Sequence, residues 1–241
     1  MDGDRFSRTR VLYGDGACRA LASSRALVCG LGAVGGFACE ILARMGVGGF
    51  LLADCDAFEL SNINRQIGAL TSTVGRRKTD VQRDRILDIN PSASVEVFDG
   101  FVDAESVGGL LGSRPDVVVD AIDTISSKSL LALRSAEAGL RLVASMGAAR
   151  RKDPSKIKTA PISKTFGCPV ASAVRKALRR GGAGGEFMCV FSDECACESS
   201  HVESGGADSR KIIGSSPEVT AVFGVRLAGL AISELLKDAV R

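Results

Sequence analysis

The chain has 241 residues, of which 45% are hydrophobic and 24% charged, so it carries enough apolar residues for a sizeable core and is not a disordered chain. Glycine is frequent at 28 residues, aromatic residues make up 5% and tryptophan is absent, which suits an α/β protein better than an aromatic-cored β-sandwich. The N-terminus has no apolar stretch of the secretory type, which predicts a cytoplasmic protein with reduced thiols. Arg226 and Glu234 interrupt the apolar stretch 219–236, which predicts a buried helix and no membrane span.

Short apolar runs alternate with helical patterns along the chain. A strand at 26–29 leads into the turn Gly30-Leu31-Gly32-Ala33-Val34-Gly35, and a helix at 37–45 is followed by a strand at 50–53, which together form one βαβ unit. The further expected elements are helices at 79–89, 128–138, 170–180 and 219–236, and strands at 95–98, 117–119, 140–144 and 188–191. This order predicts a doubly wound, mostly parallel sheet in a single domain over 1–241, with an elaborated C-terminal third.

The glycine turn predicts a nucleotide site. Without a Cβ atom, the backbone N–H groups of such a turn can approach a phosphate at a helix N-terminus, where the helix dipole also favours negative charge. Asp54 follows the second strand, where a carboxylate can accept hydrogen bonds from ribose hydroxyls. These features alone fit a nicotinamide dinucleotide as well as ATP.

The residues after the second strand favour ATP. Arg65 and Lys78 supply cations that a triphosphate requires along its length and that a leaving pyrophosphate requires in addition, whereas hydride transfer has no such need. Asp123 follows another strand, points toward the same crevice and is a candidate magnesium ligand. The sequence therefore indicates attack on a nucleoside triphosphate, and an oxidoreductase is disfavoured.

These motifs together resemble a known group of enzymes. The glycine turn, Asp54-x-Asp56, the segment Ser61-Asn62-Ile63-Asn64-Arg65-Gln66, Lys78 and Asp120-x-x-Asp123 are similar to the ubiquitin-activating-enzyme-like adenylyltransferases, the MoeB and ThiF superfamily, which adenylate a carboxylate with Mg-ATP. Segments 5–9, 88–91, 147–165 and 189–192 resemble more narrowly the tRNA threonylcarbamoyladenosine dehydratases.

The resemblance implies a homodimer that activates the carboxylate of threonylcarbamoyladenosine, next to the tRNA anticodon, as an acyl-adenylate, and then closes a five-membered ring with loss of AMP. It implies ATP and Mg²⁺ as cofactors and the following roles: phosphate contacts for Gly30, Gly32 and Gly35, ribose binding for Asp54, nucleotide contacts for Asp56 and Gln66, triphosphate contacts for Asn64, Arg65 and Lys78, magnesium binding for Asp123, and a trans-acting arginine finger for Arg8. The catalytic set is accordingly Arg8, Arg65, Lys78 and Asp123.

Charge is segregated within 147–210, the region expected to face the substrate. The stretch 141–185 holds eleven Lys or Arg and one acid, Asp153, whereas 186–210 holds six acids and one base. A basic face of this kind predicts phosphate contacts with tRNA, and a solvated surface is the alternative for each single residue. The expected tRNA-facing residues are Arg150, Arg151, Lys152, Arg175, Lys176, Arg179 and Arg180.

The eight cysteines contain no C-x-x-C pair, which sulfur-carrier activators of the superfamily commonly use for structural zinc. A zinc site built from Cys189, Cys195, Cys197 and His201 is disfavoured because C-x-C spacing is atypical of zinc ligand pairs. The dehydratase pattern usually has an acid, Pro and Leu where this chain has Cys168-Pro169-Val170. A cysteine-desulfurase or sulfur-acceptor partner stays open.

Two rival functions stay open beside the dehydratase. The first is an adenylyltransferase that activates the C-terminus of a ubiquitin-like sulfur carrier with the same residues. The second is an inactive nucleotide-binding scaffold, which the presence of Arg8, Arg65, Lys78 and Asp123 disfavours.

Overall fold

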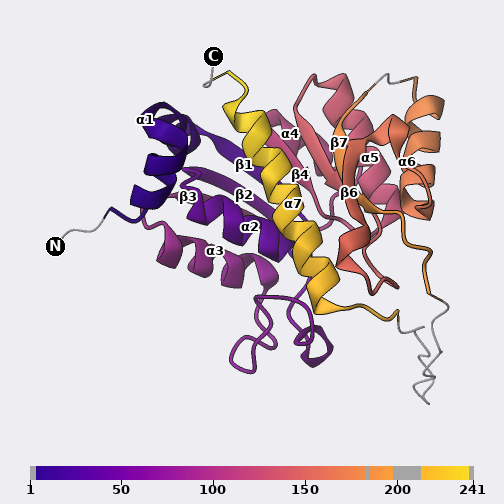
Figure 1. The fold of residues 1–241 in the computed structure, drawn as a ribbon, viewed down its shortest axis with the longest axis horizontal. Coiled ribbons are helices and arrows are strands. Elements are labelled where there is room, and N and C mark those ends of the chain that lie inside the picture. Colours follow the sequence, from indigo (N-terminus) through magenta and orange to yellow (C-terminus); the bar gives the residue numbers. More distant parts are fainter. Residues whose placement is uncertain (1–3, 183–184, 198–212, 239–241) are drawn as a thin grey trace.

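The computed structural model describes residues 4–182, 185–197 and 213–238 (Figure 1). One seven-stranded sheet has the order β3-β2-β1-β4-β5-β7-β6, and every neighbouring pair is parallel except β6 with β7. The strands are β1 (Arg25–Cys29), β2 (Gly49–Asp54), β3 (Ser94–Asp99), β4 (Val117–Asp120), β5 (Leu142–Ser145), β6 (Ile157–Pro161) and β7 (Met188–Ser192). The α-helices are α1 (Ser7–Ser23), α2 (Gly35–Arg44), α3 (Lys78–Ile89), α4 (Val107–Gly112), α5 (Ile125–Glu137), α6 (Pro169–Arg180) and α7 (Pro217–Leu236), with short 3₁₀ turns η1 (Leu60–Asn62), η2 (Pro154–Lys156) and η3 (Ile162–Lys164).

Helices cover both faces of the sheet. α2, α3 and α7 pack on one face, with α1 against α7, and α4, α5 and α6 pack on the other (Figure 1). Successive residues of a strand point to opposite faces of the sheet. Val28 of β1 packs in the core on the side of α2, α3 and α7 (the first core), and its neighbours Leu27 and Cys29 pack in the core on the side of α4, α5 and α6 (the second core). Strands buried on both faces are apolar throughout, which explains why they are visible in the sequence as continuous apolar runs.

The order of the strands locates a crevice. The chain moves outward from β1 through β2 to β3, returns to β4 on the other side of β1, and continues to β5. At such a reversal the loops that follow β1 and β4 diverge to opposite faces, leaving an opening at the carboxyl ends of the strands. The loops after β1, β2, β4 and β5 therefore meet at one edge of the sheet.

Gly35 lets α2 approach the first turn closely. A Cβ atom on Gly35 would lie 1.7 Å from the carbonyl oxygen of Gly30, a distance that no packing adjustment tolerates. The absence of a side chain at this third glycine thus allows the first turn of α2 to pack directly against the end of β1.

The predicted doubly wound, mostly parallel sheet is confirmed. Three elements were not expected from the sequence: α1, which is kinked at Gly14 and has few apolar residues facing inward; α4, which contains three glycines; and β6, an edge strand that ends at Pro161. The basic helix begins at Pro169, within one residue of its expected start.

α7 is the one helix in the described part of the chain with the length and composition of a membrane span, and 56% of its apolar window is buried inside the protein. It crosses the sheet beside α2 (Figure 1), and its inward residues, such as Phe223 and Leu227, belong to the first core. This is the packing expected of a buried core helix.

Candidate active site

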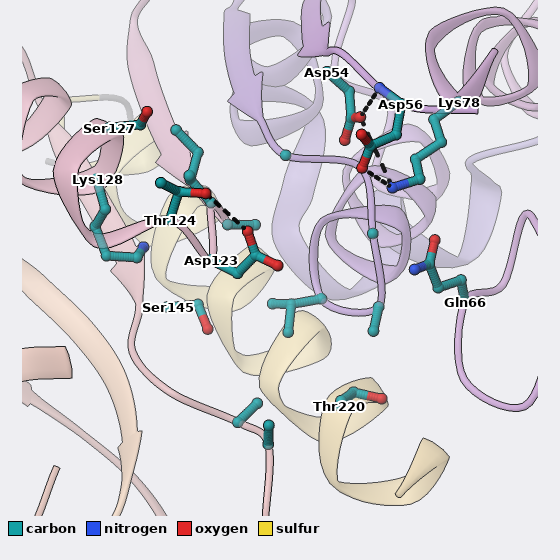
Figure 2. Close-up of a pocket in the computed structure, with 18 of the residues that line it drawn as sticks. Asp54, Asp56, Gln66, Lys78, Asp123, Thr124, Ser127, Lys128, Ser145 and Thr220 are labelled. Carbon is teal, nitrogen blue, oxygen red and sulfur yellow. Dashed lines mark hydrogen bonds and ion pairs between the residues drawn. The ribbon is translucent and has the colours of Figure 1, made fainter. Parts of the chain in front are cut away.

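A cavity of about 440 Å³ opens at the carboxyl ends of β1, β2, β4 and β5. Its wall is formed by loops from both halves of the sheet and by the first turn of α7, where Thr220 lies (Figure 2). The sequence-predicted residues that line it are Gly30, Gly32, Asp54, Asp56, Arg65, Gln66, Lys78 and Asp123. Of the other predicted residues, Gly35 lies behind the turn, and Asn64 and Arg8 do not line the cavity.

The turn after β1 follows a path that a larger residue would block. Gly30 has φ +86°, and a Cβ atom there would lie 2.7 Å from the carbonyl oxygen of Ala121 in the loop after β4. The two loops therefore touch at Gly30, which brings the glycine turn next to Asp123. Gly32 faces the amide of Gln66 across the cavity wall.

Asp54 and Asp56 connect the end of β2 to the turn after β1 and to the start of α3. Asp54 Oδ2 accepts a hydrogen bond from the N–H of Leu31 at 2.6 Å, and Oδ1 accepts from the N–H of Asp56 at 2.8 Å. The ammonium of Lys78, at the start of α3, lies 2.7 Å from Asp56 Oδ2 and 3.9 Å from Asp54 Oδ1 (Figure 2). Burial acts to raise the pKa of Asp56, but the hydrogen bond and charge of Lys78 outweigh it and lower that pKa.

Arg65 and its neighbours lie on the loop between β2 and α3. The Arg65 guanidinium donates to the carbonyl oxygen of Ser61 at 3.0 Å and to Asn64 Oδ1 at 2.8 Å, which holds it at the cavity wall. Asn64 Nδ2 donates to the carbonyl oxygen of Ser215 at 3.2 Å, so Asn64 joins this loop to the segment before α7. Gln66 Oε1 is buried and has no hydrogen-bond partner among the described residues, which leaves it able to accept from a ligand.

Asp123 lies across the cavity from Lys78 (Figure 2). Its side chain is exposed, and Oδ1 accepts a long hydrogen bond of 3.4 Å from Thr124 Oγ1. An exposed carboxylate with free lone pairs suits a hard divalent cation. Asp54, Cys55 and Asp56 also gather three ligand atoms within 4.8 Å of one another, but the Lys78 ammonium beside Asp56 opposes a second cation there.

A buried ion pair that was not expected from the sequence lies next to the cavity. Asp120, at the end of β4, is 0% exposed, and its Oδ2 lies 2.8 Å from Nζ of Lys128 on α5, which is 1% exposed and lines the cavity. Asp120 Oδ1 accepts from the N–H of Ile122 at 3.0 Å, so the same carboxylate holds the loop that carries Asp123. An acid that ends an otherwise apolar strand, with a lysine one turn into the next helix, is the signal in the sequence that could have revealed it.

Other lining residues were not predicted, among them Phe101 and Ser145. Phe101 lies in the loop after β3 and Ser145 at the end of β5, two strands on opposite sides of β1 in the sheet. A single aromatic residue in a loop and a serine that ends a short strand carry no pattern of their own, so neither could be selected from the sequence.

Only some of the residues predicted to form a basic face are exposed. Arg151 is 4% exposed and donates to the carbonyl oxygen of Ala149 at 3.0 Å, so its expected place on a tRNA-facing surface is wrong. Arg175 is half-buried, and its guanidinium donates to the carbonyl oxygen of Thr165 at 3.0 Å. The exposed members of the set are Arg150, Lys152, Lys176, Arg179 and Arg180.

The cysteines of the disfavoured zinc site differ in burial. Cys189 is buried, donates to the carbonyl oxygen of Ala160 at 3.3 Å, and burial raises its pKa to about 12. Cys195 is exposed and Cys197 is half-buried, and His201 lies outside the described residues. Cys168, at the departure from the dehydratase pattern, is buried and packs beside Gly147.

With this geometry in view, comparison with known proteins identifies the class. The ThiF family model matches residues 6–238, and the chain belongs to the ThiF family. The tRNA threonylcarbamoyladenosine dehydratase of Bacillus subtilis is 37% identical over 242 aligned residues, which cover 97% of this chain and 95% of that protein. The crystal structure of the Escherichia coli tRNA N6-threonylcarbamoyladenosine dehydratase in complex with ATP matches with a TM-score of 0.87 and 34% identity, covering 98% of this chain and 96% of the other.

The sulfur-carrier alternative matches less of the chain. The molybdopterin-synthase adenylyltransferase of Escherichia coli is 35% identical over 130 residues, which cover 53% of this chain and 51% of that protein. The resemblance expected from the sequence is therefore confirmed, and the full-length matches favour an ATP-dependent enzyme of the dehydratase type over the activator of a sulfur carrier.

The Asp120–Lys128 pair yields a stability prediction. Lys128→Met removes one partner and leaves a carboxylate buried without its counter-charge, which costs about 3–5 kcal/mol of unfolding free energy. Lys176→Met, an exposed helical lysine, is the matched control and changes stability by less than about 0.5 kcal/mol. Chemical denaturation measures both, and a Lys128→Met protein as stable as the control would show that the pair does not hold this loop.

Proposed function

We propose that the protein is a tRNA-modifying dehydratase that adenylates the carboxylate of threonylcarbamoyladenosine with ATP and then cyclises it. The observation that carries this proposal is the arrangement of Lys78, Arg65 and Asp123 around the glycine turn at one edge of the sheet. A phosphate bound at the turn would have the helix dipole of α2 beneath it and cations beside it. The full-length match to an enzyme with bound ATP supports the same use of the cavity.

The reaction requires two displacements. A carboxylate oxygen of the substrate attacks the α-phosphorus of ATP, a P–O bond to the β-phosphate breaks, and pyrophosphate leaves. A nucleophilic atom of the same substituent then attacks the activated carbonyl carbon, the ring closes, a proton is lost and AMP leaves. Because the second nucleophile is intramolecular, proximity supplies much of the rate, and no cysteine or histidine nucleophile of the enzyme is needed.

Lys78 and Arg65 would act on the phosphates. Both lie at the cavity wall with cationic groups that are held in place before ATP binds, Lys78 by Asp56 and Arg65 by Ser61 and Asn64. Preorganised charges of this kind stabilise the negative charge that develops on a departing pyrophosphate. Asp54 holds the turn and retains lone pairs for a ribose hydroxyl, and Gln66 Oε1 is free to accept from a ligand.

Asp123 would hold magnesium. Its exposed carboxylate at the cavity fits an oxygen ligand of Mg²⁺, and the ion, when bound, neutralises phosphate charge. The remaining ligands would come from phosphate oxygens and water, which is the usual arrangement for a magnesium nucleotide.

The substrate would enter from the part of the cavity lined by Ser145, the segment 146–149 and Val170. Cys168 packs behind this wall in place of the usual acid, so the wall carries less negative charge toward a carboxylate substrate. Exposed Lys152, Lys176, Arg179 and Arg180 would contact tRNA phosphates, although the last two lie about three turns along α6 from Val170. A tRNA substrate is also consistent with the cytoplasmic enzyme that the sequence predicts.

Arg8 would act in a homodimer. It is exposed on α1 and does not line the cavity of its own chain. The same helix exposes Val11 and Leu12, which are 89% and 79% accessible in the single chain and suit contact with a second copy. The proposed arginine finger therefore requires that Arg8 of one protomer reach the site of its partner.

Substrate dependence tests the proposed function. Pyrophosphate and AMP should form from ATP only with tRNA that carries threonylcarbamoyladenosine, and mass analysis should find that nucleoside lighter by one water. Dependence on a ubiquitin-like carrier protein would instead support the sulfur-carrier alternative.

Asp123→Asn should lower kcat by about 100-fold or more, whereas Asp88→Asn, on an exposed acid in the last turn of α3, should leave kcat unchanged.

Mixed dimers test Arg8. Arg8→Ala and Asp123→Ala proteins should each be inactive, but a mixture allowed to exchange subunits should recover about a quarter of wild-type activity, because half of the dimers then contain one intact composite site. Two inactive proteins that stay inactive after verified exchange would show that Arg8 does not act across the dimer.

A further inference from the structure

An exposed phenylalanine ring lies at the same sheet edge as the cavity. Phe166 is 54% exposed and lies in the segment between η3 and α6. The next residue, Gly167, has φ +68° and lies beside the carbonyl oxygen of Asp193, just past the carboxyl end of β7. Val170, four residues after Phe166, lines the cavity, so the Cα atoms of the two residues are at most about 14 Å apart.

The ring is held in place by its surroundings. It contacts Phe191 of β7 edge-on, with ring centroids 5.4 Å apart and planes at 75°. The guanidinium of Arg175 on α6 donates to the carbonyl oxygen of Thr165, the residue before Phe166, at 3.0 Å. A ring fixed in this way loses little conformational freedom when a flat group binds against it.

Two lysines lie near the ring, and one of them is paired with an acid. The ammonium of Lys158 lies over the ring at 5.5 Å from its centroid and also pairs with Asp193, and Lys164 is exposed two residues before Phe166. The basic stretch 141–185 continues on both sides of this segment. An aromatic face flanked by ammonium groups is the combination with which proteins bind unpaired bases and the phosphates beside them.

We propose that Phe166 is a stacking platform for an unpaired base of the tRNA, next to the nucleoside that enters the cavity. The proposal rests on the proposed function, because that function supplies an RNA substrate whose modified nucleoside lies beside the anticodon. It assigns base contact to Phe166 and phosphate contact to Lys164 and the exposed lysines, so the two contributions are separable by experiment.

A single-tryptophan variant tests the contact directly. Because the chain contains no tryptophan, Phe166→Trp introduces one reporter whose emission is quenched when a base stacks on it. Substrate tRNA and an oligouridine strand should quench it saturably, whereas inorganic polyphosphate, which has charge but no bases, should not. Val225→Trp, an exposed position on α7, is the matched control and should not respond to any of the three.

Binding affinity supplies the second measurement. Phe166→Leu keeps an apolar side chain against Phe191 without an aromatic face, and should raise the Kd for substrate tRNA by about tenfold. It should leave the dependence of Kd on salt unchanged, since no charge is lost, whereas Lys176→Ala should reduce that slope by about 1. Both variants should keep the wild-type affinity for ATP.

The outcomes separate this inference from the proposed function. If the wild-type enzyme converts the tRNA nucleoside but Phe166→Leu binds tRNA as tightly as the wild type, the platform alone is overturned. The same holds if bound tRNA leaves the emission of Phe166→Trp unchanged. Equal quenching by polyphosphate would also overturn it, because it would show a response to charge. Saturable quenching by tRNA without nucleoside conversion would support the platform and contradict the proposed function.

Discussion

The buried carboxylate of Asp54 joins the three segments that form the nucleotide end of the site. One oxygen accepts from Leu31 in the turn after β1, the other accepts from Asp56 after β2, and the ammonium of Lys78 at the start of α3 lies 3.9 Å away. Inside the protein, where the effective dielectric is lower than in water, these contacts are strong enough to select one arrangement of the segments. The glycine turn and the cation that would contact the triphosphate are therefore fixed relative to each other.

Charge balance explains why both acids and bases surround the cavity. A triphosphate brings about four negative charges, and the protein places Lys78 and Arg65 at the wall together with the acids Asp56 and Asp123. Asp56 is more exposed than Asp54, so it can move away from Lys78 when a phosphate arrives, whereas Asp54 is held by the backbone. The Asp123 carboxylate, across the cavity, would repel the phosphates unless a cation lay between them, which is consistent with Mg-ATP as the substrate form.

The features that could be predicted from the sequence are local ones. Apolar strands buried on both faces, the glycine turn and the acids and bases just after strand ends all leave a pattern within a few residues, and the parallel topology then brings the strand ends to one edge. Features that depend on tertiary packing could not be predicted. A lysine in a helical pattern, such as Lys128, has the same sequence whether it meets solvent or a buried Asp120.

The basic stretch shows the same limit. Seven cations were expected on one surface, but Arg151 is buried and Arg175 holds the segment before Phe166. Composition indicates that a region is basic, and only the fold decides which cations face outward. The weakly patterned elements α1, α4 and β6 were missed for a related reason, since their few inward residues are scattered among glycines and exposed polar residues.

Transfer of an isotope from substrate to product tests carboxylate adenylation most directly. If the substrate tRNA carries ¹⁸O in both carboxylate oxygens of threonylcarbamoyladenosine, attack on the α-phosphorus followed by ring closure should place one ¹⁸O atom in the AMP released. Mass spectrometry of the nucleotide products reads this outcome in a single turnover. Unlabelled AMP, or ¹⁸O found in inorganic phosphate with ADP as the nucleotide product, would contradict the account.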